Sequence, residues 1–444
     1  MAADRPLARC SSAPPAGDVS PWVGLVGLCG LGCWLALCRF WPQVVDGLGL
    51  AAPRAVMNGP DAALLGLLCA ALPMAAWQLL VDKVHRRPST GLQWQAPRRW
   101  GEGRGDSAVK LLGLWSAWAL IGAAYWLGRW YGQGPYLFAM RVIGAAVVPL
   151  MLLSIPYVLW LDRHLVERRC GAWHLGALLL GRAGACRAEA LKFLRGWAVK
   201  GFFSAFMLSI VPGGFAEVVS VDWGLVRAEP ARLAGWLTAF LFMVDVQIGT
   251  VGYLFTLRPL DAHIRSANPH LDGWLAALIC YPPFVLMNAG GPLDYHAGGA
   301  DWGFWLAGRP ALAWGWGAAL VGLTAIYAAA TLAFGIRFSN LTWRGTITCG
   351  PYRWCRHPAY LSKNLFWWGA SLPFLVRHGD AAEGWRNAAL LGLTGAVYWW
   401  RAKTEERHLL AEDPTYRAYW AWSEAHAPVT RALKQLRRVL FPRG

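Results

Sequence analysis

Apolar residues fill long stretches of this chain, and charged residues gather in the segments between them. A helix that crosses a bilayer needs roughly 17–25 consecutive, mostly apolar residues. Stretches of about this length lie near residues 22–41, 62–81, 111–128, 143–161, 200–218, 235–256, 272–289, 311–334, 360–377 and 386–401, and the last two are short and contain polar residues. The pattern predicts an all-α fold, a polytopic transmembrane bundle of about ten helices.

The overall composition agrees with this class. Of the 444 residues, 56% are hydrophobic and 15% are charged, and the mean hydropathy is +0.33. A soluble domain would carry about 25% charged residues. The 29 Trp residues also suit a membrane protein, because Trp concentrates at bilayer interfaces. The ten Cys residues show neither a Cys-x-x-Cys pair nor the His spacing of a zinc site, so no metal site is predicted.

The net charge of +17 is distributed unevenly along the chain. If the N-terminus is cytoplasmic, the segments on that side hold 33 of the 42 Lys and Arg residues. An excess of Lys and Arg in cytoplasmic segments is the usual signal of membrane topology. The distribution therefore predicts cytoplasmic termini and explains the basic excess without a nucleic-acid partner.

Local departures from the apolar pattern mark three places in the first 300 residues. Basic residues alternate with Leu and aromatic residues over 187–200, which suits either an amphipathic interfacial helix or a basic loop. Asp245 and Gln247 interrupt the sixth stretch, where hydrogen bonding between helices is the commoner explanation and a functional site is the alternative. The segment 281–284, Tyr-Pro-Pro-Phe, should break the seventh stretch, and broken backbone at membrane depth is tolerated where it lines a cavity.

The last two apolar stretches carry polar chemistry at their ends. Residues 350–362 read Gly-Pro-Tyr-Arg-Trp-Cys-Arg-His-Pro-Ala-Tyr-Leu-Ser, and residues 401–406 read Arg-Ala-Lys-Thr-Glu-Glu. Arg401 and Glu405 are four residues apart and so share one helix face. Pro351 and Pro358 should hold the first segment out of regular helix and expose its backbone groups. The charges on both sides predict a polar site at the cytoplasmic ends of two neighbouring helices.

Residues from about 311 to 430 resemble the integral-membrane methyltransferases typified by isoprenylcysteine carboxyl methyltransferase. This group includes phospholipid N-methyltransferases and small bacterial thiol methyltransferases. The resemblance rests on an ordered set of residues, namely Gly350-Pro351-Tyr352-Arg353, Arg356-His357-Pro358-Ala359-Tyr360, Arg401, Glu405-Glu406, Tyr416 and Tyr419. The resemblance covers about a quarter of the chain. We therefore expect four parts: a disordered N-terminus (1–20), a transmembrane region of unknown role (21–300), a methyltransferase-like core (301–430) and a basic tail (431–444).

The resemblance implies S-adenosylmethionine as cofactor, entering from the cytoplasm, and a methyl acceptor entering from the lipid bilayer. The implied catalytic residues are His357, Arg401 and Glu405. The implied cofactor-binding residues are Gly350, Pro351, Tyr352, Arg356, His357, Pro358, Tyr360, Glu405 and Glu406. The acceptor stays open between an isoprenylcysteine-like carboxylate, a small thiol and a lipid, including a phospholipid amine.

Elementary chemistry is consistent with these roles. The carboxylate of S-adenosylmethionine needs cationic donors such as Arg356 or His357, and its hydroxyl or amino groups need acceptors such as Glu405 or Glu406. Aromatic faces suit adenine or the sulfonium, and the candidates are Tyr352, Tyr360, Trp367 and Trp399. A thiol or amine acceptor must also lose a proton, which His357 or a Glu would take. The polar residues Ser339, Asn340 and Thr342 either cap the cofactor loop or satisfy backbone groups at a helix end.

Two other functions are compatible with parts of the pattern. Membrane sterol reductases bind NADPH with a similar C-terminal hairpin, but the combination of Arg356-His357-Pro358 with Glu405-Glu406 favours a methyltransferase. A transporter is the second alternative. The absence of an internal repeat in the sequence argues against it.

Overall fold

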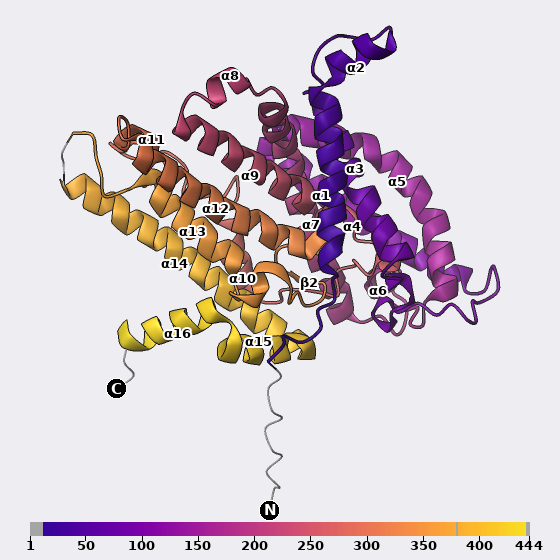
Figure 1. Cartoon of the computed structure of the whole chain (residues 1–444). Helices are drawn as coiled ribbons and strands as arrows, with labels where there is room; N and C mark the ends of the chain where they lie inside the picture. The colour runs from indigo at the N-terminus through magenta and orange to yellow at the C-terminus, as the bar shows by residue number, and fades with distance from the viewer. Residues whose placement is uncertain (1–11, 379–380, 441–444) are drawn as a thin grey trace, which may run out of the picture.

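The computed structural model describes residues 12–378 and 381–440. Within these ranges the protein is all-α, apart from an antiparallel pair of two-residue strands, β1 (Ser266–Ala267) and β2 (Thr342–Trp343). The long helices form a bundle, and α15 (Pro414–His426) and α16 (Pro428–Leu440) lie across one end of it (Figure 1). The first described residues and β2 lie at the same end.

Among the described residues, seven helices are long and apolar enough to cross a membrane. They are α1 (Pro21–Arg39), α3 (Pro60–Leu80), α4 (Arg104–Leu127), α5 (Tyr136–His164), α7 (Arg187–Val219), α9 (Pro230–Leu254) and α12 (Pro310–Phe334). The protein is therefore a multi-pass integral membrane protein. The remaining helices are α2 (Trp41–Leu48), α6 (Gly171–Leu179), α8 (Trp223–Val226), α10 (Leu271–Leu278), α11 (Trp302–Trp305), α13 (Pro358–Ser371) and α14 (Ala381–Glu412).

The predicted count of ten spans is not confirmed. The stretch near 272–289 forms only the short helix α10, because Pro282 and Pro283 supply no N–H groups for further helical bonds. The stretch near 360–377 lies in α13, whose 14 residues are fewer than a simple crossing needs. Helix α14 has 32 residues, but charged residues occupy its second half.

The basic segment 187–200 does not form a separate interfacial helix. It is the beginning of α7, a continuous helix of 33 residues. At 1.5 Å per residue such a helix is about 50 Å long, which exceeds the hydrocarbon core of about 30 Å. The basic first turns therefore extend beyond the length needed for crossing, and Lys200 donates to the hydroxyl of Thr256 at 2.7 Å.

Polar side chains and close backbone contacts join the helices around α9. Asp245 accepts a hydrogen bond from the Thr331 hydroxyl on α12, and Gln247 donates to the Ala63 carbonyl on α3 at 3.2 Å. Both contacts agree with the predicted hydrogen bonding between helices. Gly252 lies so close to the Phe338 carbonyl that an added Cβ would be 2.3 Å from that oxygen. This close approach holds the segment after α12 against the end of α9.

Proline and capping residues set the helix starts near the site. Pro358 is at the first position of α13, and Pro414 is at the first position of α15. Proline suits this position because its N–H would be unpaired there in any case. The Asp413 carboxylate caps α15 by accepting from the Thr415 amide at 2.8 Å, and it also accepts from the Trp343 indole at 2.9 Å. The start of α15 is thereby fixed against β2.

Candidate functional site

A cavity lies at the end of the bundle that is crossed by α15. Its volume is about 160 Å³. A water takes up about 30 Å³ in the liquid, so the cavity has room for a ligand larger than a single water. Its lining includes Tyr281, Tyr327, Thr331, Arg337, Ser339, Asn340, Thr342, Arg344, Tyr352, Arg356, His357, Tyr360, Lys363, Tyr398, Arg401, Glu405, His408, Tyr416 and Tyr419.

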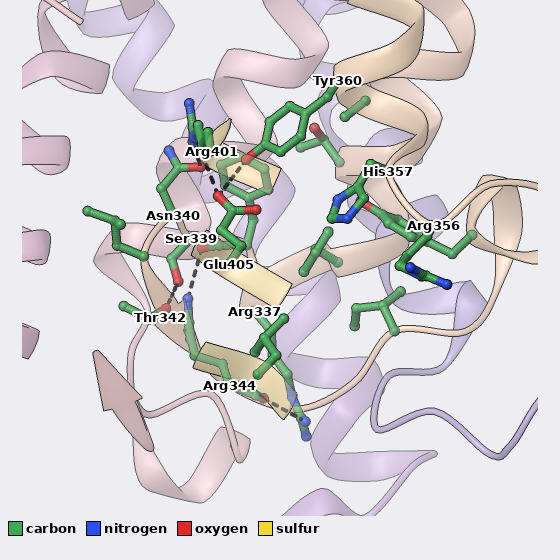
Figure 2. Close-up of a pocket in the computed structure, with 18 of the residues that line it drawn as sticks. Arg337, Ser339, Asn340, Thr342, Arg344, Arg356, His357, Tyr360, Arg401 and Glu405 are labelled. Atoms are coloured by element: carbon green, nitrogen blue, oxygen red, sulfur yellow. Dashed lines mark hydrogen bonds and ion pairs between the residues drawn. The ribbon is translucent and has the colours of Figure 1, made fainter. Parts of the chain in front are cut away.

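Glu405 is fixed in the cavity wall by two neighbours. The Tyr360 hydroxyl donates to Glu405 Oε1 at 2.5 Å, and Arg401 Nε donates to the same oxygen at 3.3 Å (Figure 2). Arg401 is 2% exposed and also donates to Asn340 Oδ1 at 2.6 Å and to the Tyr281 hydroxyl at 3.3 Å. These contacts join α13, α14 and two loops. They hold the Glu405 carboxylate in the cavity wall with the Arg401 guanidinium beside it.

A second cluster of charges holds the start of α13 to α14. Glu406 accepts from His357 Nε2 at 2.8 Å, from Arg356 at 3.1 Å and from Lys403 at 2.6 Å. Burial acts to raise the pKa of Glu406, but the hydrogen bonds and charges of His357 and Lys403 outweigh it and hold the pKa well below the usual value. The Glu406 side chain is therefore ionised throughout the physiological pH range.

The guanidinium of Arg356 is occupied by protein groups. It donates to Glu406, to Glu424 at 2.5 Å and to the Ser423 hydroxyl at 3.0 Å, and it lies 4.7 Å from the centre of the Trp420 ring. These partners lie on α14 and α15. Arg356 thus binds three helices together, and its neighbour His357 stacks on Tyr360 with ring centres 5.8 Å apart.

The structure brings most of the predicted site residues to one cavity. Six of them line it, namely Tyr352, Arg356, His357, Tyr360, Arg401 and Glu405. The other four do not contribute to the lining. Gly350 begins the short turn before α13 with a φ of +58°, and Pro351 follows it. Pro358 starts α13, and Glu406 lies behind Arg356 and His357.

The aromatic candidates fall into two groups. Tyr352 and Tyr360 line the cavity, whereas Trp399 is 56% exposed and is not part of the lining. Trp367 packs beside the cavity-lining ring of Tyr398, with ring centres 5.1 Å apart. The Trp399 ring therefore lies outside this cavity.

Two arginines ahead of the motif also line the cavity, and sequence reasoning missed both. Arg337 donates to Asp261 Oδ2 at 2.7 Å, and Asp261 also accepts from the Ser89 hydroxyl at 2.7 Å. Arg344 is 3% exposed and donates to four backbone carbonyls, including that of Gly252 at 2.8 Å. Burial, followed by the charge of Arg337, lowers the pKa of Arg344 to about 9. In sequence both residues are indistinguishable from topology signals at the end of an apolar stretch.

The N-terminal segment also contacts the site end. Asp18 and Thr346 exchange two hydrogen bonds of 2.8 Å, one through the Asp18 backbone amide and one through its carboxylate. The Trp422 indole donates to the Ser12 carbonyl at 3.2 Å. Within the N-terminal segment 1–20, for which the sequence predicts disorder, Asp18 thus contacts the loop before the motif and Ser12 contacts α15. Residues 1–11 lie outside the described ranges.

Comparisons of this chain with models of known protein families, with curated proteins and with solved structures find no match. No family is identified by them, and the case for a function rests on the cavity itself.

Proposed function

We propose that this protein is a membrane methyltransferase that uses S-adenosylmethionine and a hydrophobic or membrane-permeable acceptor. One observation carries the proposal: residues from two separated motifs, 350–360 and 401–405, line the same cavity. Figure 2 shows Tyr360 and Arg401 directed at Glu405, with His357 on the adjacent wall. The distribution of Lys and Arg supports a cytoplasmic position for this cavity, which a water-soluble cofactor requires.

The residues present fit the chemical groups of this cofactor. Glu405 uses Oε1 for both of its bonds to described residues, and Oε2 accepts none from them, so this oxygen is an acceptor for hydroxyl or amino groups. His357 lies at the start of α13, where free helical N–H groups add to the attraction for a carboxylate. The rings of Tyr352 and Tyr360 offer faces for adenine or the sulfonium.

The cofactor supplies an electrophilic methyl group on a positively charged sulfur. The protein would contribute mainly by orienting the two reactants, because correct alignment provides much of the rate of a bimolecular transfer. Arg401 would position Glu405, and Glu406 would hold the orientation of the His357 ring. Arg356 is a positioning residue in this proposal, since protein groups already occupy its donors.

The test is equilibrium binding of labelled S-adenosylmethionine to the purified full chain in detergent. Glu405→Gln removes the acceptor charge and should weaken binding at least tenfold, about 1.4 kcal/mol, which is within the range for a hydrogen bond to a charged group. His357→Ala should weaken it similarly. Glu383→Gln makes the same chemical change at the opposite end of α14 and should leave binding unchanged.

NADPH serves as the competitor that separates the two enzyme classes. Undiminished binding of S-adenosylmethionine in a large excess of NADPH supports the methyltransferase. Binding of NADPH by a protein that fails to bind S-adenosylmethionine would refute the proposal in favour of a reductase. Binding of neither ligand would refute both.

A further inference from the structure

The cations of the cavity differ in how far the protein neutralises them. Five Lys and Arg side chains line the cavity among the described residues, against one carboxylate, Glu405. Arg337 pairs with Asp261 at 2.7 Å, and Arg401 pairs with Glu405 at 3.3 Å. Arg356 pairs with two glutamates, and Arg344 donates to backbone carbonyls. Lys363 is the fifth cation, and it has no such partner.

Lys363 lies on α13 among aromatic rings. Its Nζ is 5.2 Å from the ring centre of Trp367, 5.5 Å from that of Tyr327 and 5.6 Å from that of Tyr398. No carboxylate of the described residues comes within 4.0 Å of this nitrogen. The charge of Asp245 acts on it from a longer distance, while Asp245 itself is hydrogen-bonded to Thr331.

An ammonium in these surroundings is a strong site for an anion. The faces of three rings stabilise a cation by about 0.5–2 kcal/mol each, but they give it no acceptor for its N–H groups. An ionised group without a counter-ion in apolar surroundings is costly, and such groups often mark functional sites. Tyr327, Tyr398 and Lys363 all line the cavity, so a ligand in the cavity has access to the ammonium.

We infer that the methyl acceptor binds as an anion, a carboxylate or thiolate on an apolar body, with its charge at Lys363. This inference rests on the proposed function and narrows its acceptor. The lone pair of the bound anion forms the new bond to the methyl carbon, the carbon–sulfur bond breaks, and its electron pair stays on the cofactor sulfur. One positive and one negative charge are lost together, and a low-dielectric site favours that change. An amine acceptor is disfavoured, because its cationic form would face the unpaired ammonium of Lys363.

The test compares ligands that share an apolar chain and differ in headgroup. The full chain in lipid nanodiscs is titrated with dodecanoate, dodecanol, dodecylamine and dodecyl phosphate by equilibrium dialysis, with empty nanodiscs correcting for partitioning. The pH is mildly alkaline, so that the carboxylate is ionised. Dodecanoate should bind at least about tenfold more tightly than dodecanol, and dodecylamine should bind most weakly.

Substitutions of Lys363 assign the difference to this residue. Lys363→Met should reduce the affinity for dodecanoate to that for dodecanol and leave dodecanol unchanged, whereas Lys363→Arg should retain the preference. Equal affinities of the wild type for dodecanoate and dodecanol would overturn the inference, as would tighter binding of dodecylamine. Dodecyl phosphate bound more tightly than dodecanoate would also overturn it, because the site would then suit a phospholipid headgroup. The wild-type ranking decides the question even if Lys363→Met does not fold.

A double variant separates a ligand site from a structural counter-charge. If Lys363 serves only to balance Asp245, the pair Lys363→Met with Asp245→Asn will restore wild-type affinity for dodecanoate, and the inference fails. A double variant that still binds dodecanoate no better than dodecanol supports it. Binding of labelled S-adenosylmethionine is measured on the same samples and should change less than about twofold in Lys363→Met. Loss of that binding in the wild type, with Lys363-dependent binding of dodecanoate retained, would refute the proposed function and leave the anion site standing.

Discussion

Replacement of Asp261 by Asn should destabilise the protein strongly, although the two side chains have nearly the same shape. Asp261 is fully buried and accepts from Arg337, which is 1% exposed, at 2.7 Å. The substitution leaves the Arg337 charge buried without its nearest counter-ion. Removing one partner of a buried pair typically costs about 3–5 kcal/mol.

The expected cost for this site is near the lower limit, about 3 kcal/mol. Asp18 remains 3.7 Å from Arg337, and Arg337 keeps its bond of 3.0 Å to the Arg344 carbonyl. The control is Asp272→Asn, which breaks an exposed pair with Arg407 whose atoms are 2.5 Å apart. Exposed pairs contribute about 0–1 kcal/mol, so the two substitutions should differ by at least about 2 kcal/mol.

The assay is reversible unfolding of the full chain in mixed micelles with increasing denaturing detergent, followed by Trp fluorescence. Arg337→Met completes a double-mutant cycle with Asp261→Asn. The double variant should be less destabilised than the sum of the single variants by about 1–3 kcal/mol, because no unpaired Arg337 charge remains. The reasoning is refuted if Asp261→Asn and Asp272→Asn unfold with free energies within 1 kcal/mol of each other, or if the cycle shows no coupling.

Two further predictions concern packing and pH. Gly252→Ala should destabilise the protein by about 1–3 kcal/mol, because its Cβ would meet the Phe338 carbonyl. Gly235→Ala on the same helix places its Cβ where nothing lies within 4 Å, so it should be neutral or stabilising by up to about 1 kcal/mol. The same unfolding assay measures both variants, and equal effects would contradict the close approach at Gly252. His408 is buried with a hydrogen bond of 2.9 Å to Ser266, and burial, followed by nearby positive charge, lowers its pKa from 6.5 to about 4. The unfolded state therefore binds the proton first as the pH falls, so stability should decrease from pH 6.5 towards pH 4 by up to about 1.4 kcal/mol per unit. His408→Gln should flatten this part of the pH profile of the unfolding free energy, and an unchanged slope would exclude His408 as its source.

The sequence predicts that the protein belongs to the membrane class, and it predicts most of the motif residues that line the cavity. The two predictions succeed for different reasons. Apolar length is a local property, and it is retained in helices such as α1 and α12. The motif residues meet because they lie at the adjoining ends of two consecutive helices, α13 and α14, which form one hairpin. Their proximity can therefore be predicted from a short part of the chain. The proline pair at 282–283 ends its helix as predicted, and Tyr281 beside it lines the cavity.

The rest of the site depends on contacts between distant parts of the chain. Asp261 meets Arg337 across 76 residues, and Asp18 meets Thr346 across 328. No periodicity or local motif encodes such pairs. In the sequence, basic residues such as Arg337 and Lys363 indicate only topology, because a single sequence does not show whether a basic residue faces headgroups or a cavity. For a related reason, the sequence does not predict that α7 is one continuous helix. Basic residues over 187–200 are compatible both with an interfacial helix and with the end of a membrane-spanning helix that extends beyond the bilayer.

These distant contacts bear on the first 300 residues, for which the sequence suggests no role. The segment 337–347 forms one wall of the cavity, and that region supplies the counter-ions of Arg337 and two of the four carbonyl acceptors of Arg344. Asp261 and Asp18 neutralise Arg337, while the carbonyls of Gly252 and Ala262 accept from Arg344. The motif-bearing hairpin supplies none of these partners. Without these partners Arg337 would lose both counter-ions and Arg344 would lose half of its carbonyl acceptors, which would cost several kcal/mol, so the N-terminal helices stabilise the conformation of this wall. The two regions therefore form one structural unit at the site, and the N-terminal helices contribute to the shape of the cavity.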